Sequence, residues 1–351
     1  MAIYEKLKKL HDKNGEVEFE AEIPAPIIEE HMTLAAREAA EDLSVPGFRK
    51  GKVPEHIARE HVGEMYLLEA AADAVLHAAI REIAEDEELR AIGKPQLIIT
   101  KIAPKNPLGF KVRFALYPDI SLPDYKKIAA EVMARKESTD VTDKDIEDAI
   151  LRLRQMLADP TGKNQGTAPL PEVNDEFVKK LGPFKDLAAF REELKKQLAQ
   201  EKESNNKDLK RDLIVKEIVD RSKIKIPSML VEQELEDFAA NRTEELKHAG
   251  ITMEDYLKQI GKTSDALVKE ERGLIEDQIK TSLVFSEIRK KEDLKPSERE
   301  VQINMARLKL RYPDRDEHSL RETAEAVAMQ EELFRMLEGS DEKPEEKETS
   351  K

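Results

Sequence analysis

The chain has no cysteine and no tryptophan, and only 5% of its 351 residues are aromatic. Without cysteine it can form neither a disulfide framework nor a thiolate, which is typical of proteins of the reducing cytoplasm. Charged residues make up 38% of the chain, a share that favours long solvated helices over one large compact core. We therefore expect a cytoplasmic protein of two or three domains.

Long apolar runs are also missing. A membrane-spanning helix needs about 20 consecutive apolar residues, and even residues 70–80 are interrupted by Asp73 and His77. The first 15 residues carry lysines and no apolar signal segment. The net charge of −15 argues against broad binding to nucleic acid, so any contact with RNA has to be local. No membrane partner is expected.

Motifs for metal, nucleotide or acid–base chemistry are incomplete. His56 and His61 are five residues apart, which places them on different sides of a helix, and no cysteine can complete a zinc site. Gly261-Lys262-Thr263 resembles the end of a phosphate-binding loop, but Tyr256 stands where its first glycine is required. Carboxylates are too numerous to single out a general acid or base. We expect no cofactor, no metal and no catalytic residue.

Residues 1–118 predict a small α+β domain. Apolar and charged residues alternate over 15–23 and 108–117, as in half-buried strands with opposite charges on their solvent side, and a third strand is expected over 97–102. Helices are expected over 26–43, directly after Pro54, and over 64–88. The last helix carries one apolar stripe, made of Met65, Leu68, Ala72, Val75, Ala79 and Ile83.

The rest of the chain predicts helices. Residues 119–170 are expected to be a linker with one helix at 143–158, for which Thr142 is the N-cap. Residues 171–338 predict an all-α domain, whose expected helices cover 186–222, the segment from Pro227 to Gly250, a short segment after Thr252, 264–292, 296–311 and 317–338. Residues 339–351 are acidic and lack apolar residues, which predicts a disordered tail.

The segment 47–54, Gly-Phe-Arg-Lys-Gly-Lys-Val-Pro, concentrates the most specific chemistry of the chain. Its two glycines permit a tight turn, and Pro54 suits the start of the following helix. Between them, one aromatic ring and three cations are expected to point into solvent. In an acidic chain, such a loop indicates contact with a polyanionic partner at one place.

This loop resembles the ribosome-docking signature of the trigger factor family of bacterial chaperones. Further segments resemble the same family in the same order: 141–146 with Leu153 and Arg154, 170–177 with Gly182, and 224–231 with Glu234. The resemblance implies an α+β N-terminal ribosome-binding domain followed by an elongated all-α C-terminal domain with helical arms.

The resemblance also implies the partners. The docking residues would be Gly47, Phe48, Arg49, Lys50, Gly51, Lys52 and Pro54, which contact a ribosomal protein and adjacent ribosomal RNA at the exit tunnel. The other partners would be nascent or unfolded polypeptides, and a homodimer of the free protein stays open. The protein is then expected in the cytoplasm, partly bound to ribosomes.

One departure from the family is large. Members usually carry a prolyl isomerase domain of FK506-binding type between the linker helix and the C-terminal domain, whereas here only residues 157–171 separate the two. This segment contains no aromatic residue to line a proline pocket. We therefore expect a chaperone without enzyme activity.

A chaperone that holds unfolded chains needs apolar groups that are exposed but dispersed, because a continuous patch would aggregate. Met305, Met329, Phe334 and Met336 are the candidate client contacts, since methionine adapts to many partners. For the methionines, simple packing between helices is the competing interpretation. Two other functions stay open: an acidic helical scaffold for a folded partner that never visits the ribosome, and a prolyl isomerase by family label only.

Overall fold

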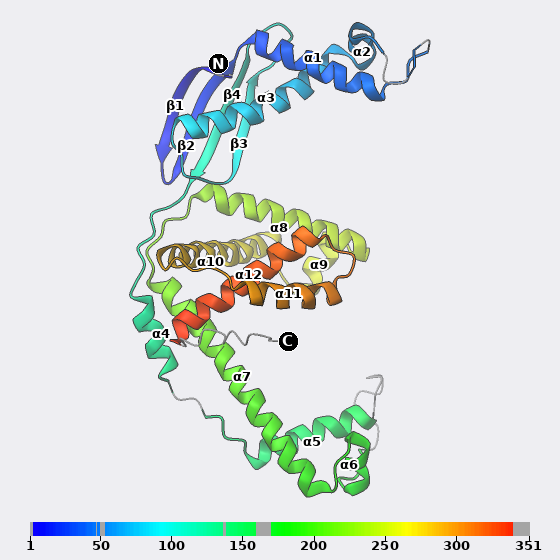
Figure 1. Ribbon diagram of the computed structural model, residues 1–351, viewed down its shortest axis with the longest axis vertical. Helices are drawn as coiled ribbons and strands as arrows, with labels where there is room; N and C mark the ends of the chain where they lie inside the picture. Colours follow the sequence, from blue (N-terminus) through cyan, green and yellow to red (C-terminus); the bar gives the residue numbers. More distant parts are fainter. Residues whose placement is uncertain (1–2, 47, 50–52, 136–137, 159–169, 340–351) are drawn as a thin grey trace, which may run out of the picture. The chain divides into compact units, whose positions relative to one another are not determined.

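The computed structural model describes residues 3–46, 48–49, 53–135, 138–158 and 170–339 (Figure 1). The predicted tail lies outside these residues beyond Gly339, as do residues 136–137 and 159–169 of the predicted linker. The chain forms two compact units. The first unit combines residues 1–121 with 223–285, and the second combines 122–222 with 286–351. The domain boundaries expected from the sequence at 118, 170 and 338 stay a prediction.

A four-stranded antiparallel sheet lies at the centre of the first unit. Its strands are β1 (Glu5–Lys13), β2 (Glu16–Ile23), β3 (Ala91–Lys101) and β4 (Leu108–Leu116), in the spatial order β1-β2-β4-β3. The alternation expected for β2 and β4 is confirmed, since Phe19 and Val112 form a pair and both are buried. The expected charge pairing on the solvent side is confirmed as well: Arg113 lies 3.0 Å from Glu18, its partner on β2.

Two strands differ from the expectation. Strand β1 was not predicted, because it carries four lysines and lacks the alternation of a half-buried strand. It is an edge strand whose residues are exposed except for the half-buried Leu7. Strand β3 begins at Ala91, well before the expected residue 97. The sequence did not reveal this earlier start, because Gly93 and Pro95 interrupt the apolar pattern there.

Three helices follow β2 in the chain: α1 (Ala25–Asp42), α2 (Glu55–Val62) and α3 (Glu64–Asp86), of which α2 packs on α1 beyond the sheet. Residues of α1, α3, β2 and β4 share one hydrophobic core, and Figure 1 shows α3 crossing the sheet. The predicted stripe of α3 is buried from Leu68 to Ile83. Met65 is the exception, with 52% of its surface exposed. It lies in the first turn of α3, before Leu67, where the buried part of the helix begins.

The first unit also contains α8 (Ser228–Ala249), α9 (Met253–Ile260) and the larger part of α10 (Ser264–Lys291). The expected helix ends are confirmed. Gly250 and Gly261 close α8 and α9 in the left-handed conformation that glycine adopts without strain. The Thr252 hydroxyl caps α9 by accepting a hydrogen bond from the Asp255 amide.

The second unit is helical. It contains α4 (Tyr125–Met133), α5 (Asp143–Ala158), α6 (Asp175–Leu181), α7 (Leu187–Arg221), α11 (Glu298–Arg311) and α12 (Glu317–Glu338). Helix α5 and its Thr142 cap are confirmed, because the Thr142 hydroxyl accepts a hydrogen bond from the Asp145 amide. The expectation of a single helix within 119–170 was wrong, since α4 precedes α5. The signal was present in the sequence, because Tyr125, Ile128, Ala129 and Val132 recur at steps of three and four residues, and all four are buried.

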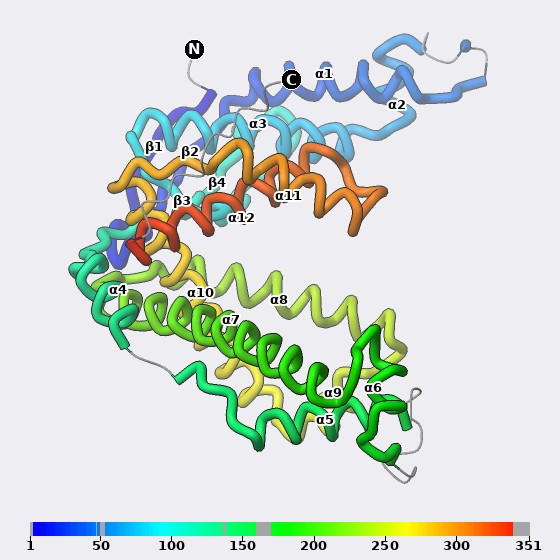
Figure 2. The backbone as a smooth tube through the Cα atoms, turned by 60° about the horizontal axis from the view of Figure 1, so that its bottom comes forward, coloured from blue at the N-terminus to red at the C-terminus, as the bar shows by residue number. Residues whose placement is uncertain are grey.

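Helix α7 is the long charged helix expected from the sequence, and its apolar residues lie toward its two ends. Phe190, Leu194 and Leu198 pack with α5 and α6 near the start. Ile214 and Ile218 are buried near the other end. Helices α11 and α12 run side by side (Figure 2) and share a core around Val301. Among the described residues, none of the helices is both long enough and apolar enough to cross a membrane.

Candidate functional site

The segment between α1 and α2 carries the predicted loop. Helix α1 ends at Asp42, and the amide of the extended residue Leu43 still donates to the Ala39 carbonyl oxygen. The base of the loop is closed by a small apolar cluster. Its buried members are Ala40, Val53 and Ala58, and Leu43, Val45 and Ile57 pack against them. This cluster, called the apolar clamp below, joins the chain where it leaves α1 to the chain where it enters α2.

The tip of the loop is accessible. Phe48 has 42% of its surface exposed although it is a large apolar residue, and Arg49 is exposed beside it. The Phe48 amide donates a hydrogen bond to the Val45 carbonyl oxygen at 3.0 Å, which makes the chain turn before the ring. The other predicted tip residues, Gly47, Lys50, Gly51 and Lys52, lie outside the described residues.

Helices α1 and α2 are joined by ion pairs as well as by the clamp. Arg59 of α2 reaches α1, where it donates to the Glu29 carboxylate at 2.7 Å and to the Thr33 hydroxyl at 2.6 Å. Arg37 of α1 donates to Glu55 at 3.1 Å. Pairs that solvent still reaches each stabilise by about 1 kcal/mol or less, so they add to the apolar clamp in joining α1 to α2. Pro54 directly precedes α2, as the sequence predicted.

The four predicted client residues lie in different surroundings. Met305, Met329 and Met336 are half-buried, and Met305 packs against the core that α11 and α12 share. Phe334 is only 6% exposed, and the guanidinium of Arg211 lies over its ring at 4.7 Å. A ring that is almost fully buried and covered by a cation is not free to contact a client.

More exposed apolar residues of α11 were missed from the sequence. Leu310 is 87% exposed, Ile303 is also exposed, and so is Tyr312 directly after the helix. The signal was present, because 303 and 310 are seven residues apart and share one helix face. Val301, Met305 and Leu308 form the opposite face, which packs against α12.

A second apolar surface lies in the first unit, where α8, α9 and α10 meet. A cavity of about 470 Å³ is lined there by the exposed residues Phe238 and Leu274, together with Tyr256 and Ile260. The same cavity is lined by Arg242 and Glu271, which form an ion pair from α8 to α10. The ion pair fixes the two helices, while the apolar side chains stay accessible.

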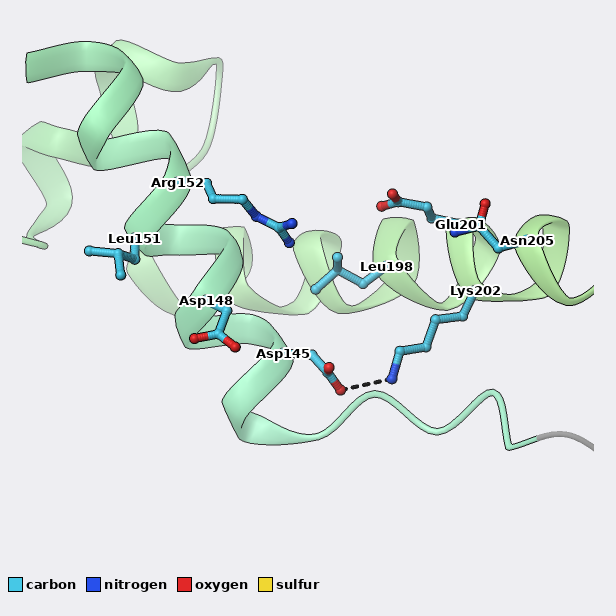
Figure 3. A pocket seen from close by; sticks show the side chains of 8 residues that line it. All are labelled: Asp145, Asp148, Leu151, Arg152, Leu198, Glu201, Lys202 and Asn205. Atoms are coloured by element: carbon cyan, nitrogen blue, oxygen red, sulfur yellow. Dashed lines mark hydrogen bonds and ion pairs between the residues drawn. The ribbon is translucent and has the colours of Figure 1, made fainter. Parts of the chain in front are cut away.

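A polar cavity of about 520 Å³ lies between α5 and α7 in the second unit (Figure 3). Its walls carry both signs of charge, and Lys202 donates to the Asp145 carboxylate at 2.8 Å. The hydrogen bonds from Lys202 and then from Thr142 hold the pKa of Asp145 well below its ordinary value. Asp145 therefore works in the helix cap and in the joint between α5 and α7. Among the described residues, no group of histidines and carboxylates is arranged to hold a metal ion.

A small α+β domain that exposes the Phe48 ring beside Arg49 is thus combined with helices whose apolar side chains are exposed but dispersed. These features define a chaperone that binds polypeptides. Comparison with known protein families agrees. The model "Bacterial trigger factor protein (TF)" matches residues 5–153, and the model "Bacterial trigger factor protein (TF) C-terminus" matches 186–337. The chain belongs to the trigger factor family of ribosome-associated chaperones.

Individual relatives support this assignment. The chain is 24% identical to the trigger factor of Carboxydothermus hydrogenoformans, over 84% of this chain and 88% of that protein. It is also 24% identical to the trigger factor of Moorella thermoacetica, over 85% of this chain and 84% of that protein. A solved structure from a study of promiscuous substrate recognition by the trigger factor chaperone matches 95% of this chain and 99% of its own, with a TM-score of 0.56 and 19% identity. That likeness concerns the fold.

Proposed function

We propose that this chain docks on the ribosome through the 47–54 loop and holds apolar segments of nascent chains until they bury their own surface. The observation that carries the docking proposal is the exposed Phe48 ring beside Arg49, on a loop whose base is clamped by buried apolar residues. A large ring that lies next to a cation and outside any core is suited to a partner that offers an apolar pocket and phosphates.

The electrostatics favour a contact of limited size. The chain as a whole carries a charge of −15, so its general field repels RNA, and only the basic loop attracts it. Two or three phosphate contacts give a modest, salt-sensitive affinity, while Phe48 supplies apolar burial that salt does not screen. Attachment is therefore reversible, which suits a chaperone that returns to the cytoplasm between rounds.

To hold an unfolded client, the protein needs apolar surface that is accessible but dispersed. Two surfaces meet this requirement: the exposed face of α11 with Ile303 and Leu310, and the cavity between α8, α9 and α10. Of the sequence candidates, the half-buried Met305, Met329 and Met336 stay in the proposal as flexible residues of α11 and α12, and Phe334 is left out. Each 100 Å² of apolar surface that a client covers contributes about 2.5 kcal/mol.

The proposed activity involves no enzyme step. The alignment with the Carboxydothermus relative runs over 381 residues, which is more than the 351 of this chain, so part of that relative has no counterpart here. Neither family model covers residues 154–185, where members of the family usually carry the isomerase domain. We propose that the isomerase is the missing part.

Co-sedimentation with ribosomes tests the docking proposal. The variant Phe48→Ala with Arg49→Ala should lose most of its ribosome binding and keep its thermal stability, because both side chains are exposed. A matched control is Tyr66→Ala with Arg81→Ala, an exposed ring and an exposed cation on α3. Equal co-sedimentation of the two double variants would contradict docking by the loop. It would favour instead a scaffold for a folded partner.

Aggregation of a denatured client tests the holding proposal. Ile303→Glu with Leu310→Glu should weaken the suppression of light scattering, because both residues lie on the exposed face of α11. The control Lys309→Gln with Arg311→Gln changes the net charge of the same helix by the same amount, and both exposed residues are sequence neighbours of Leu310, so they point away from its face. If both pairs reduce suppression equally, net charge and not apolar contact explains the effect.

A further inference from the structure

The two edges of the sheet differ in composition. Strand β1 carries four lysines and two register irregularities, which are common means of preventing another strand from pairing with an edge. Strand β3 forms the opposite edge (Figure 1) and contains the uncharged run Gln96–Ile99 between two irregularities. This run pairs with β4 in regular register. The unprotected part of this edge is therefore short and regular in register.

The side chains of this run are apolar and exposed. Leu97, Ile98 and Ile99 have 36%, 54% and 44% of their surface exposed. Leu97 lies opposite Val112 and Ile99 lies opposite Phe110, and both partners on β4 are buried. Residues directly opposite in an antiparallel pair share a face. The apolar face that covers the core therefore continues to the edge of the sheet, where it stays accessible.

The backbone of the same run is also accessible. Alternate residues of an edge strand direct their N–H and C=O groups away from the sheet. Within the described parts of the chain, residues 96–101 have backbone partners on β4 and on no other element. The first residues of β3 are not available to another strand. The Gln233 side chain of α8 donates to the Lys94 carbonyl oxygen, and the Leu230 side chain lies against Gly93. The free edge thus begins at Gln96.

We infer that residues 96–101 of β3 bind an extended apolar segment of an unfolded polypeptide as an added fifth strand. This inference rests on the proposed holding function and gives it a second mode of contact. Backbone pairing does not depend on client sequence, while Leu97 and Ile99 favour apolar side chains. A client is favoured over a second copy of this chain, because Lys94 and Lys101 bracket the run and each copy carries a charge of −15.

Hydrogen exchange with a bound client tests the inference. A permanently unfolded, apolar client polypeptide is added to the full chain, and amide exchange is followed by mass spectrometry. Those amides of 96–101 that point away from β4 should exchange at least about fivefold more slowly with client, because pairing protects them. Amides of β1 are the internal control and should not change. Unchanged exchange in 96–101, while the client's aggregation is still suppressed, would overturn the inference and leave the holding function intact.

Substitutions at the edge add a second readout. Ile98→Lys and Ile98→Glu should each weaken client binding about fivefold, because a charge on an edge strand discourages the pairing of another strand. Leu10→Lys, at an exposed position of β1, is the matched control and should bind as the unchanged chain does. Slower exchange of 96–101 without client, which grows with protein concentration, would assign the edge to a second copy and also overturn the inference. If the protein without substitutions does not suppress aggregation of the client, the holding function itself is contradicted.

Discussion

The carboxylate of Glu16, near the start of β2, accepts a hydrogen bond from the Met229 amide at 2.9 Å in the first turn of α8. The Ser228 hydroxyl donates to the same oxygen at 2.7 Å. The helix N-terminus offers free amides and a partial positive charge, so a carboxylate from another element acts here as its cap. Glu16 is among the few buried charged residues of the described chain. It joins two segments that are more than 200 residues apart in sequence.

We predict that Glu16→Ala lowers the free energy of unfolding by about 1–3 kcal/mol, because the Met229 amide loses its partner in a buried site. Glu16→Gln should cost less, since an amide oxygen can still accept the bond. Urea unfolding at pH 7 measures both. Glu5→Gln, at an exposed position of β1, is the control and should have little effect.

The same contact predicts a pH dependence. Burial alone would raise the pKa of Glu16, but the hydrogen bonds from Ser228 and Met229, with Arg113 nearby, outweigh burial and lower it. A lowered pKa in the folded state means that the stabilisation is complete above the ordinary glutamate pKa, about 4.3. It is lost as the pH falls through the folded-state pKa. The acid-induced loss of stability should therefore be smaller in Glu16→Gln, and identical pH profiles would contradict the prediction.

We predict a weak salt dependence of ribosome binding. With two or three phosphate contacts, the slope of log K against log salt concentration should be roughly −2 to −3. Arg49→Ala should reduce the slope by about one unit, whereas Phe48→Ala should lower the affinity and leave the slope unchanged. Co-sedimentation at several salt concentrations measures both. A slope far steeper than this would indicate an extended RNA contact outside the loop.

Arg211 should be a strong single determinant of stability in the second unit. Its guanidinium donates to Glu338 at 2.5 Å, makes two bonds of 3.1 Å to Glu331 and covers the Phe334 ring. Lysine cannot reproduce this planar geometry, so we predict that Arg211→Lys costs about 1–2 kcal/mol and Arg211→Ala up to about 3 kcal/mol. Thermal unfolding measures the loss.

The control for Arg211 is Arg321→Lys. Arg321 also contacts two carboxylates, Glu298 and Glu325, but its side chain is much more exposed. Exposed pairs contribute about 1 kcal/mol or less, so this variant should change stability little. Equal losses at both positions would show that burial and the stacked ring do not add to the effect of Arg211.

The elements that could be predicted from sequence are those with a strong local signal. The alternation of β2 and β4, the stripe of α3, and the caps at Thr142, Thr252 and Gly250 each follow from a few neighbouring residues. The exposure of Phe48 was predicted in the same way, from a ring placed between a glycine and two cations. It is confirmed at 42%.

The remaining features depend on contacts that are distant in sequence. Strand β1 forms by pairing with β2, and Leu7 alone of its residues packs against the core, so its lysine-rich sequence shows no alternation. Phe334 was assigned to the surface because Arg211, which covers it, lies more than 100 residues earlier. The exposed edge of β3 was hidden for the opposite reason, since an apolar run normally predicts a buried strand.

The proposed absence of the isomerase makes a kinetic prediction. Isomerisation of an X-Pro bond takes tens to hundreds of seconds without a catalyst. An enzyme accelerates such a step when present in small amounts, whereas a holding chaperone acts only in proportion to the client that it binds. We predict that a proline-limited refolding step keeps its rate when this chain is added at about one hundredth of the client concentration. Refolding followed by fluorescence after a long denaturation, which equilibrates the prolines, measures that rate.

Two controls make this result decisive. A prolyl isomerase added at the same low ratio has to accelerate the step, which shows that the bond is accessible to a catalyst. At excess of this chain, refolding should be unchanged or slower, because a bound segment cannot bury its apolar surface. Acceleration that grows with catalytic amounts of this chain would place an isomerase site within it and would contradict the proposal. Acceleration at stoichiometric amounts alone would reflect protection from aggregation, and it would disappear when the client is diluted.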